Sequence, residues 1–258
     1  MYTDIFDSHA HYTDKAFDDD RKNMLGSLTE SGVCAVINCG SDIASSVSSV
    51  ELANEYGFVY AACGVHPEEA DSVPVGFINT LTNLAKAPKC VAIGEIGLDY
   101  YWRQDNKERQ KEVFEQQILL AKSLDLPVIV HDREAHGDTL EILKKHSPKG
   151  VLHCFSGSVE TAYEILKLGM YIGIGGAVTF KNARKSVEVC QMLPLDRLLL
   201  ETDCPYMAPV PMRGKRNNSS YITFVAEKIA EIKGTTAQEI LNITRKNAET
   251  VFQIEPMF

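Results

Sequence analysis

The chain has 258 residues, of which 45% are hydrophobic, and 35 acidic against 26 basic side chains give it a net charge of -9. This apolar content excludes a disordered chain, and the charge excludes a protein that holds nucleic acid through a broadly basic surface, so any phosphate contact must be local or carried by a metal. No apolar run reaches the ~20 residues of a membrane span, and the N-terminus lacks a signal-peptide pattern, so we expect no membrane contact. The seven cysteines include no C-x-x-C pair, so we expect a reduced protein of the cytoplasm.

Short apolar runs alternate with longer amphipathic stretches along the whole chain. Their length and β-branched content are typical of buried parallel strands. In chain order, the predicted strands are 5–6, 34–37, 58–63, 90–93, 127–130, 151–152, 170–174 and 198–200. Eight strand and helix units in about 250 residues favour one α/β domain over residues 1–258, a closed (β/α)8 TIM barrel. Periodicity alone leaves an open doubly wound sheet possible.

The stretches between the strands have the spacing of helices. Residues 108–124 and 158–168 each place their apolar side chains on one face. Helical spacing returns over 222–232, and Thr236-Ala-Gln-Glu then has the form of a capping box that begins a last helix. We therefore expect a distorted or extended helical segment after the eighth strand.

Polar side chains follow five of the predicted strands, at the end where each strand finishes. In chain order they are His9 and His11, Glu95, His131, His153 and Asp203. In a (β/α)8 barrel this end holds the active site, because separate strands aim their last side chains at one point. A lone H-x-H pair or a strand-end carboxylate is often only structural, but four of the seven histidines fall at such positions. A metal site is therefore the favoured interpretation.

The spacing and chemistry of these side chains indicate which ions they would hold. His9 and His11 are two residues apart, so both imidazoles face the same side of a strand. With the two carboxylates they form a mixed nitrogen and oxygen set, typical of Zn, Mn, Co or Ni, and of Mg where carboxylates and phosphate dominate. His131 and His153 lie on successive strands and suit a second ion, with Glu95 as the bridge. Two such ions are the usual device for hydrolysing phosphoryl esters, so we predict two divalent cofactors, Mg, Mn or Zn.

Other residues near these positions have two possible roles. Asp7 and Glu201 lie two residues before ligand positions, so they either orient a ligand imidazole or make a buried structural hydrogen bond. Residues 100–102 form an aromatic cluster beside Glu95, which either stacks on an unpaired base or packs on the barrel rim.

Five blocks of residues, in order along nearly the whole chain, resemble the signature blocks of the TatD-type deoxyribonucleases, which are metal-dependent TIM barrels of the amidohydrolase superfamily. The blocks are Asp-Ser-His-Ala-His at 7–11, Gly-Val-His-Pro at 64–67, Gly-Glu-Ile-Gly-Leu-Asp-Tyr at 94–100, His-Cys-Phe-Ser-Gly at 153–157 and Glu-Thr-Asp-Cys-Pro-Tyr at 201–206. The resemblance implies a two-metal hydrolase of DNA phosphodiesters, often a Mg-dependent exonuclease.

The same resemblance implies roles for individual residues. One ion would be held by His9, His11, Glu95 and Asp203, and the other by Glu95, His131 and His153. His66 begins a loop after the third strand and is expected to contact the scissile phosphate rather than only anchor its loop. Arg213, Lys215 and Arg216 follow the eighth strand, where this fold often binds phosphate, and are expected to grip the substrate. The Glu-Pro that often follows this basic stretch in the family is absent, which affects substrate preference.

The ligand pattern predicts two ions that activate a hydroxide, and the resemblance implies a deoxyribonuclease, expected to be a 3′–5′ exonuclease. Glu95 and Asp203 are the expected catalytic residues, and Asp203 accepts the proton of the attacking water. The expected partner is DNA, as single strands or ends. An ester or amide hydrolase of the same superfamily, such as a deacylase of D-aminoacyl-tRNA, is the alternative. A metal-binding protein without activity is disfavoured by the full ligand set.

Overall fold

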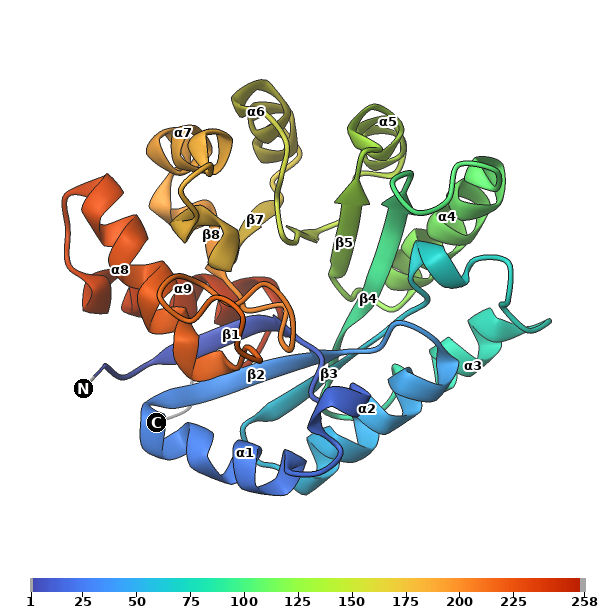
Figure 1. Cartoon of the computed structure of the whole chain (residues 1–258). Coiled ribbons are helices and arrows are strands. Elements are labelled where there is room, and N and C mark those ends of the chain that lie inside the picture. Colours follow the sequence, from blue (N-terminus) through green and yellow to red (C-terminus); the bar gives the residue numbers. More distant parts are fainter. Residues whose placement is uncertain (1, 256–258) are drawn as a thin grey trace.

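The computed structural model describes residues 2–255, and its strands confirm the predicted TIM barrel (Figure 1). The strands pair in parallel, in the order of the chain. They are β1 (Ile5–Ala10), β2 (Val33–Cys39), β3 (Val59–Cys63), β4 (Cys90–Asp99), β5 (Val128–Arg133), β6 (Gly150–Leu152), β7 (Tyr171–Ile174) and β8 (Leu198–Leu200). The first strand also meets the segment after the last one, because His11 N donates to Cys204 O at 2.8 Å and Asp203 N donates to His9 O at 3.0 Å. The sheet is therefore a nearly closed barrel.

Helices connect the strands and lie around the outside of the barrel (Figure 1). Over residues 2–255 they are α1 (Arg21–Leu28), α2 (Ile43–Glu55), α3 (Phe77–Leu84), α4 (Lys107–Ser123), α5 (His136–His146), α6 (Val159–Lys167), α7 (Arg184–Met192), α8 (Ile222–Lys233) and α9 (Ala237–Val251). As its spacing predicts, Thr236 caps α9, and its side chain accepts the N–H of Glu239 at 3.2 Å. Helices α8 and α9 form the expected extension after β8. None of the described helices is long and apolar enough to cross a membrane.

Apolar side chains form two layers, one between the strands and the helices and one inside the barrel. The inner layer combines strand residues such as Ile129, Val151 and Leu199 with Val251 and Phe252 at the end of α9. All five are buried. The end of α9 thus packs against the inner strand residues and fills one end of the barrel. The polar side chains gather at the other end, where the strands finish.

Helix α4 fixes the ends of β3 and β4 through two buried glutamines. Gln117 accepts the N–H of Val65 at 2.8 Å and donates to its carbonyl at 3.0 Å. Gln110 does the same for Asp99, at 2.9 and 3.0 Å. Each glutamine side chain therefore pairs with a backbone N–H and C=O that have no neighbouring strand to bond. These bonds hold Asp99, and His66 next to Val65, in place.

Candidate metal centre

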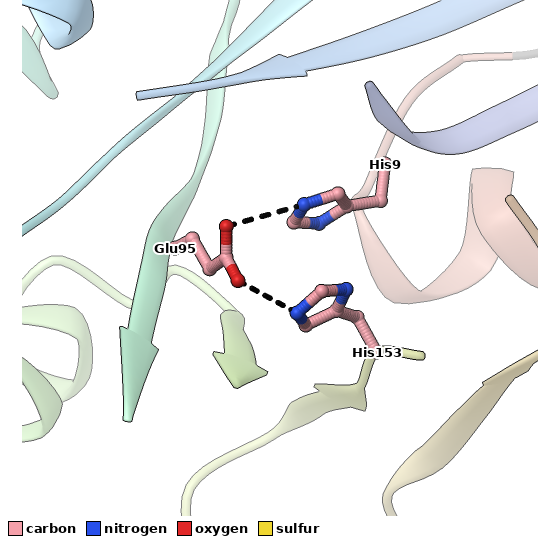
Figure 2. A group of neighbouring side chains, drawn as sticks. All are labelled: His9, Glu95 and His153. Atoms are coloured by element: carbon pink, nitrogen blue, oxygen red, sulfur yellow. Dashed lines mark ion pairs between the residues drawn. The ribbon is translucent and has the colours of Figure 1, made fainter. Parts of the chain in front are cut away.

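Glu95 lies at the centre of the polar end, and each of its two oxygens faces a different group of imidazoles. Figure 2 shows Oε2 directed at His9, with Nε2 3.3 Å away, and Oε1 directed at His153, with Nε2 2.7 Å away. Oε2 also lies 3.4 Å from Nε2 of His11, and Oε1 lies 2.8 Å from Nδ1 of His131. One carboxylate therefore joins two clusters of possible ligands.

The first cluster contains His9, His11 and Asp203, whose ligand atoms are close enough to share one ion. The two Nε2 atoms are only 2.9 Å apart, and Oδ1 of Asp203 lies 3.7 Å from His9 and 3.4 Å from His11. The H-x-H spacing on β1 thus brings both imidazoles to one point, as predicted.

The second cluster lies on the other side of Glu95. Oε1 is within 3.5 Å of the imidazoles of His131, His153 and His66. His131 and His153 each stand two residues after an inner-layer residue of β5 or β6, so the strand alternation turns them into the barrel as well. His66 was predicted to contact substrate, and the structure places it beside Glu95 and His131.

Polar groups behind the imidazoles fix their orientation. Nδ1 of His11 lies 3.0 Å from the carbonyl of Cys39, and Nε2 of His131 lies 3.0 Å from Oδ2 of Asp99. These hydrogen bonds set which ring nitrogen carries the proton and which is free to bind a metal. Nδ1 of His153 lies 3.8 Å from Oε1 of Glu201 and makes no hydrogen bond to any described residue.

Asp7 and Glu201, for which the sequence left two roles possible, have different surroundings in the structure. Glu201 is fully buried beside His153, and a Cβ at Gly173 would meet its Oε2 at 2.2 Å, so only glycine leaves room there. Asp7 instead accepts hydrogen bonds from the side chains of Thr202 and Ser219, both at 2.6 Å. Asp7 therefore fastens β1 to the segment after β8, whereas Glu201 accepts the backbone N–H of Cys154 beside the His153 ring.

Electrostatics in the centre favour bound positive charge. Burial opposes ionisation of Glu95, but the imidazoles of His153 and His9 outweigh it and hold the pKa of the carboxyl well below its ordinary value. Burial also opposes a charge on His11 and His131, yet their carboxylate neighbours raise both pKa values to about 10. Convergent imidazoles and carboxylates of this kind are a fitting donor set for divalent ions such as Zn or Mn.

The centre lies at the bottom of a pocket of about 730 Å³ at the ends of the strands. Trp102 and Arg133 line one part of its wall and Tyr206 another. The predicted basic residues do not line it. Arg216 is bound to Asp20 by two hydrogen bonds, of 2.8 and 2.6 Å. The guanidinium of Arg213 lies 4.0 Å over the ring of Phe180, and Lys215 is exposed.

Comparisons with known proteins agree with this site. Residues 6–253 match the family described as TatD related DNase. A relative from Bacillus subtilis (strain 168), named uncharacterized metal-dependent hydrolase YabD, is 44% identical over 253 residues, which cover 97% of this chain and 99% of the relative. The 3′-5′ ssDNA/RNA exonuclease TatD of Pantoea vagans (strain C9-1) is 34% identical over 261 residues, which cover 97% of this chain and 100% of that protein.

A solved structure gives the same result for the fold. The crystal structure of YJJV, a TatD homolog from Escherichia coli K12, matches with a TM-score of 0.92 and 33% identity, and the match covers 98% of this chain and 100% of that chain. The resemblance seen in the sequence blocks is therefore confirmed along nearly the whole chain. The chain belongs to the TatD-related DNase family and is a hydrolase of that family.

Proposed function

We propose that the protein is a divalent-metal-dependent exonuclease that hydrolyses phosphodiester bonds at the 3′ ends of single-stranded DNA. The main support for this proposal is that the two oxygens of Glu95 face two separate clusters of imidazoles. Relatives named 3′-5′ ssDNA/RNA exonuclease support the substrate class. Two ions of Mg, Mn or Zn held here would supply Lewis acidity and a water that ionises near neutral pH.

The hydrogen bonds of the imidazoles support four of them as metal ligands. His11 and His131 each direct one nitrogen at an oxygen acceptor behind them, the Cys39 carbonyl and the Asp99 carboxylate. Once the second ring proton has left, the nitrogen facing Glu95 is the one that is free to bind a metal. His9 and His153 likewise turn Nε2 toward Glu95 (Figure 2). With Glu95 and Asp203, these four imidazoles are the proposed ligands.

His66 differs from the other four in its tautomer. Its Nδ1 accepts the backbone N–H of Glu68 at 3.3 Å, so the ring proton is on Nε2, the atom that faces the centre. Burial, helped by nearby His131, lowers the pKa of His66 to about 3, so the ring is neutral. A neutral N–H donor beside the ligands suits a hydrogen bond to a phosphate oxygen, and we assign His66 this role.

Asp203 and the basic loop complete the proposed site. The side chain of Asp203 is 21% exposed at the pocket, so it can accept a proton from an attacking water there. Arg213 and Lys215 lie outside the pocket, where they would meet the part of the strand that has not entered. Arg216 already pairs with Asp20 and holds this loop to the start of α1.

The test uses protein freed of metal and single-stranded DNA labelled at its 5′ end. Mg, Mn or Zn is added in turn, and the products are separated by length. We expect a ladder that shortens one nucleotide at a time from the 3′ end, with no products before metal is added. Release of amino acid from charged tRNA without any cleavage of DNA would instead identify the protein as a deacylase.

A further inference from the structure

Arg133, the last residue of β5, is the one lysine or arginine among the described residues that line the pocket. Six acidic side chains line the same pocket: Asp14, Glu68, Glu95, Asp99, Asp132 and Asp203. Seven of the nine arginines of the chain pair with a carboxylate. Within residues 2–255 the guanidinium of Arg133 has no carboxylate partner and no side-chain hydrogen bond, although acidic groups surround it. Its N–H donors are thus available to an anion that enters the pocket.

Two exposed aromatic rings hold Arg133 in position. Its guanidinium lies 4.0 Å from the centre of the Tyr101 ring and 5.4 Å from that of Trp102. The two rings meet edge to face, and the side chains are 54% and 59% exposed. Stacking on a ring orders the planar guanidinium but leaves the N–H groups along its edge free, which is the geometry that binds phosphate through two hydrogen bonds.

The position of these rings is tied to the metal centre through Asp99. Oδ1 of Asp99 accepts the backbone N–H groups of Tyr101 and Trp102, at 2.9 and 3.0 Å, while Oδ2 lies 3.0 Å from His131. Tyr100 N also donates to the carbonyl of Arg133 at 2.9 Å. The aromatic pair and the arginine are therefore built onto the same strand ends as the proposed ligands, rather than on a detached surface loop.

We propose that Arg133 and Trp102 form a subsite for one nucleotide of a single strand, beside the scissile bond. Arg133 takes its phosphate, and the exposed face of Trp102 stacks on its unpaired base. Stacking of this kind needs a base that is free of its complement, so the subsite selects single strands over duplex. This inference rests on the proposed function and adds the groups that recognise the substrate.

The experiment uses the fact that Trp102 is the single tryptophan of the chain, so its fluorescence reports directly on the subsite. The metal-loaded protein is titrated with an oligothymidylate whose phosphorothioate linkages resist hydrolysis, and with a duplex of matched length. We expect quenching of Trp102 emission by the single strand and none by the duplex. Arg133→Ala should raise the Kd about tenfold and reduce the salt dependence by about one unit of slope.

Two further variants separate a specific contact from a general loss of charge. Arg133→Lys keeps the charge and should restore the salt slope but not the full affinity, because lysine lacks the planar fork. Arg197→Ala is the matched control, because Arg197 also lies over a tyrosine ring, that of Tyr171 at 5.2 Å, but precedes β8 at the other end of the barrel. It should leave the Kd, the KM and the slope unchanged.

Cleavage assays give the second readout. Arg133→Ala should raise the KM for single-stranded DNA with kcat little changed. Trp102→Ala, followed by anisotropy of a labelled strand, should weaken binding by roughly five- to a hundredfold, and Trp102→Phe by less. If the wild type cleaves single strands while Arg133→Ala behaves like Arg197→Ala, the proposed subsite is wrong but the proposed nuclease function is still supported. If the wild type neither binds nor cleaves nucleic acid, the proposed function itself fails.

Discussion

Glu95 is the residue that joins the two clusters of the proposed metal centre. Because each of its oxygens faces a different cluster, Glu95→Ala should weaken binding of both ions, each by at least about tenfold, which is the lower range seen when even outer-sphere partners of a metal are removed. Calorimetric titration of metal into the metal-free variant measures this. The fold should survive, because the centre lies at the end of the barrel and not in its apolar layers.

Glu68→Ala provides the control for that prediction. Glu68 also lines the pocket but belongs to neither ligand cluster, so its loss should leave metal content unchanged. Wild-type metal affinity and activity in Glu95→Ala at limiting metal would contradict the two-cluster interpretation.

The pKa values of the centre predict how metal affinity depends on pH. His11 and His131, with pKa values raised to about 10, carry protons at pH 7 in the metal-free protein, and those protons must leave before a metal binds. Affinity should therefore fall as the pH falls below about 10, by a factor of about ten per pH unit for each proton displaced. Titrations at pH 8 and pH 6, in two buffers of different ionisation enthalpy, measure both the affinity and the protons released. Unchanged metal retention between pH 8 and pH 5 would exclude a histidine-rich site.

Single residues also show what the sequence could and could not reveal. The position of His9, His11 and Glu95 at strand ends is enough to predict them as site residues from the sequence alone. His66 likewise follows a strand, β3. Its tautomer depends on one hydrogen bond, from the backbone N–H of Glu68, that no sequence pattern indicates. No sequence pattern indicates Arg133, because its importance comes from being the one lysine or arginine among the described residues that line the pocket, which is a property of the assembled barrel.

At the scale of elements, β4 shows why the boundaries were less predictable than the strands themselves. The apolar pattern indicates a strand at 90–93, but β4 continues to Asp99 and includes Glu95. Glycines and buried carboxylates interrupt the pattern, and the carboxylates have partners on other elements, such as His131 on β5 for Asp99. Local sequence rules fail here because the strand carries the functional groups.

Helix α4 supports a prediction about stability. Gln117→Leu leaves the buried N–H and carbonyl of Val65 without partners, so the free energy of unfolding should fall by about 1–3 kcal/mol for each group left unpaired. Urea unfolding measures this loss, and a lower kcat would follow because Val65 precedes His66. Gln116→Leu is the matched control on the same helix, since the side chain of Gln116 donates to the exposed Glu112 side chain and not to a buried backbone group. Equal stability of the two variants would refute the role assigned to Gln117.

At the scale of the whole molecule, the repeated alternation of strands and helices was enough to predict a barrel. Periodicity does not show that the sheet closes into a barrel. Closure depends on backbone hydrogen bonds that join His9 and His11 to the segment after β8. The inner layer was equally hidden, since it joins residues of β5 and β6 to Phe252, more than a hundred positions away in the sequence. The domain prediction of one unit over the whole chain stays a prediction.

Phe252→Ala tests that prediction. Phe252 is 2% exposed inside the barrel, and its truncation should lower the free energy of unfolding by about 3–5 kcal/mol. Circular dichroism follows all the helices, whereas fluorescence follows Trp102 at the pocket, far from the substitution. In a single domain both transitions should shift together to lower denaturant concentration. Separate shifts would show that the two ends of the barrel unfold independently.

The filled end of the barrel also decides how a polymer can use the pocket. Val251 and Phe252 pack among the inner strand residues and close that end of the barrel with apolar side chains, so the pocket opens at the opposite end, where the strands finish. On the proposed function, a polynucleotide would present its terminus at this opening and would not thread through the barrel. On the proposed function, product exit and strand advance would therefore share the mouth of the pocket.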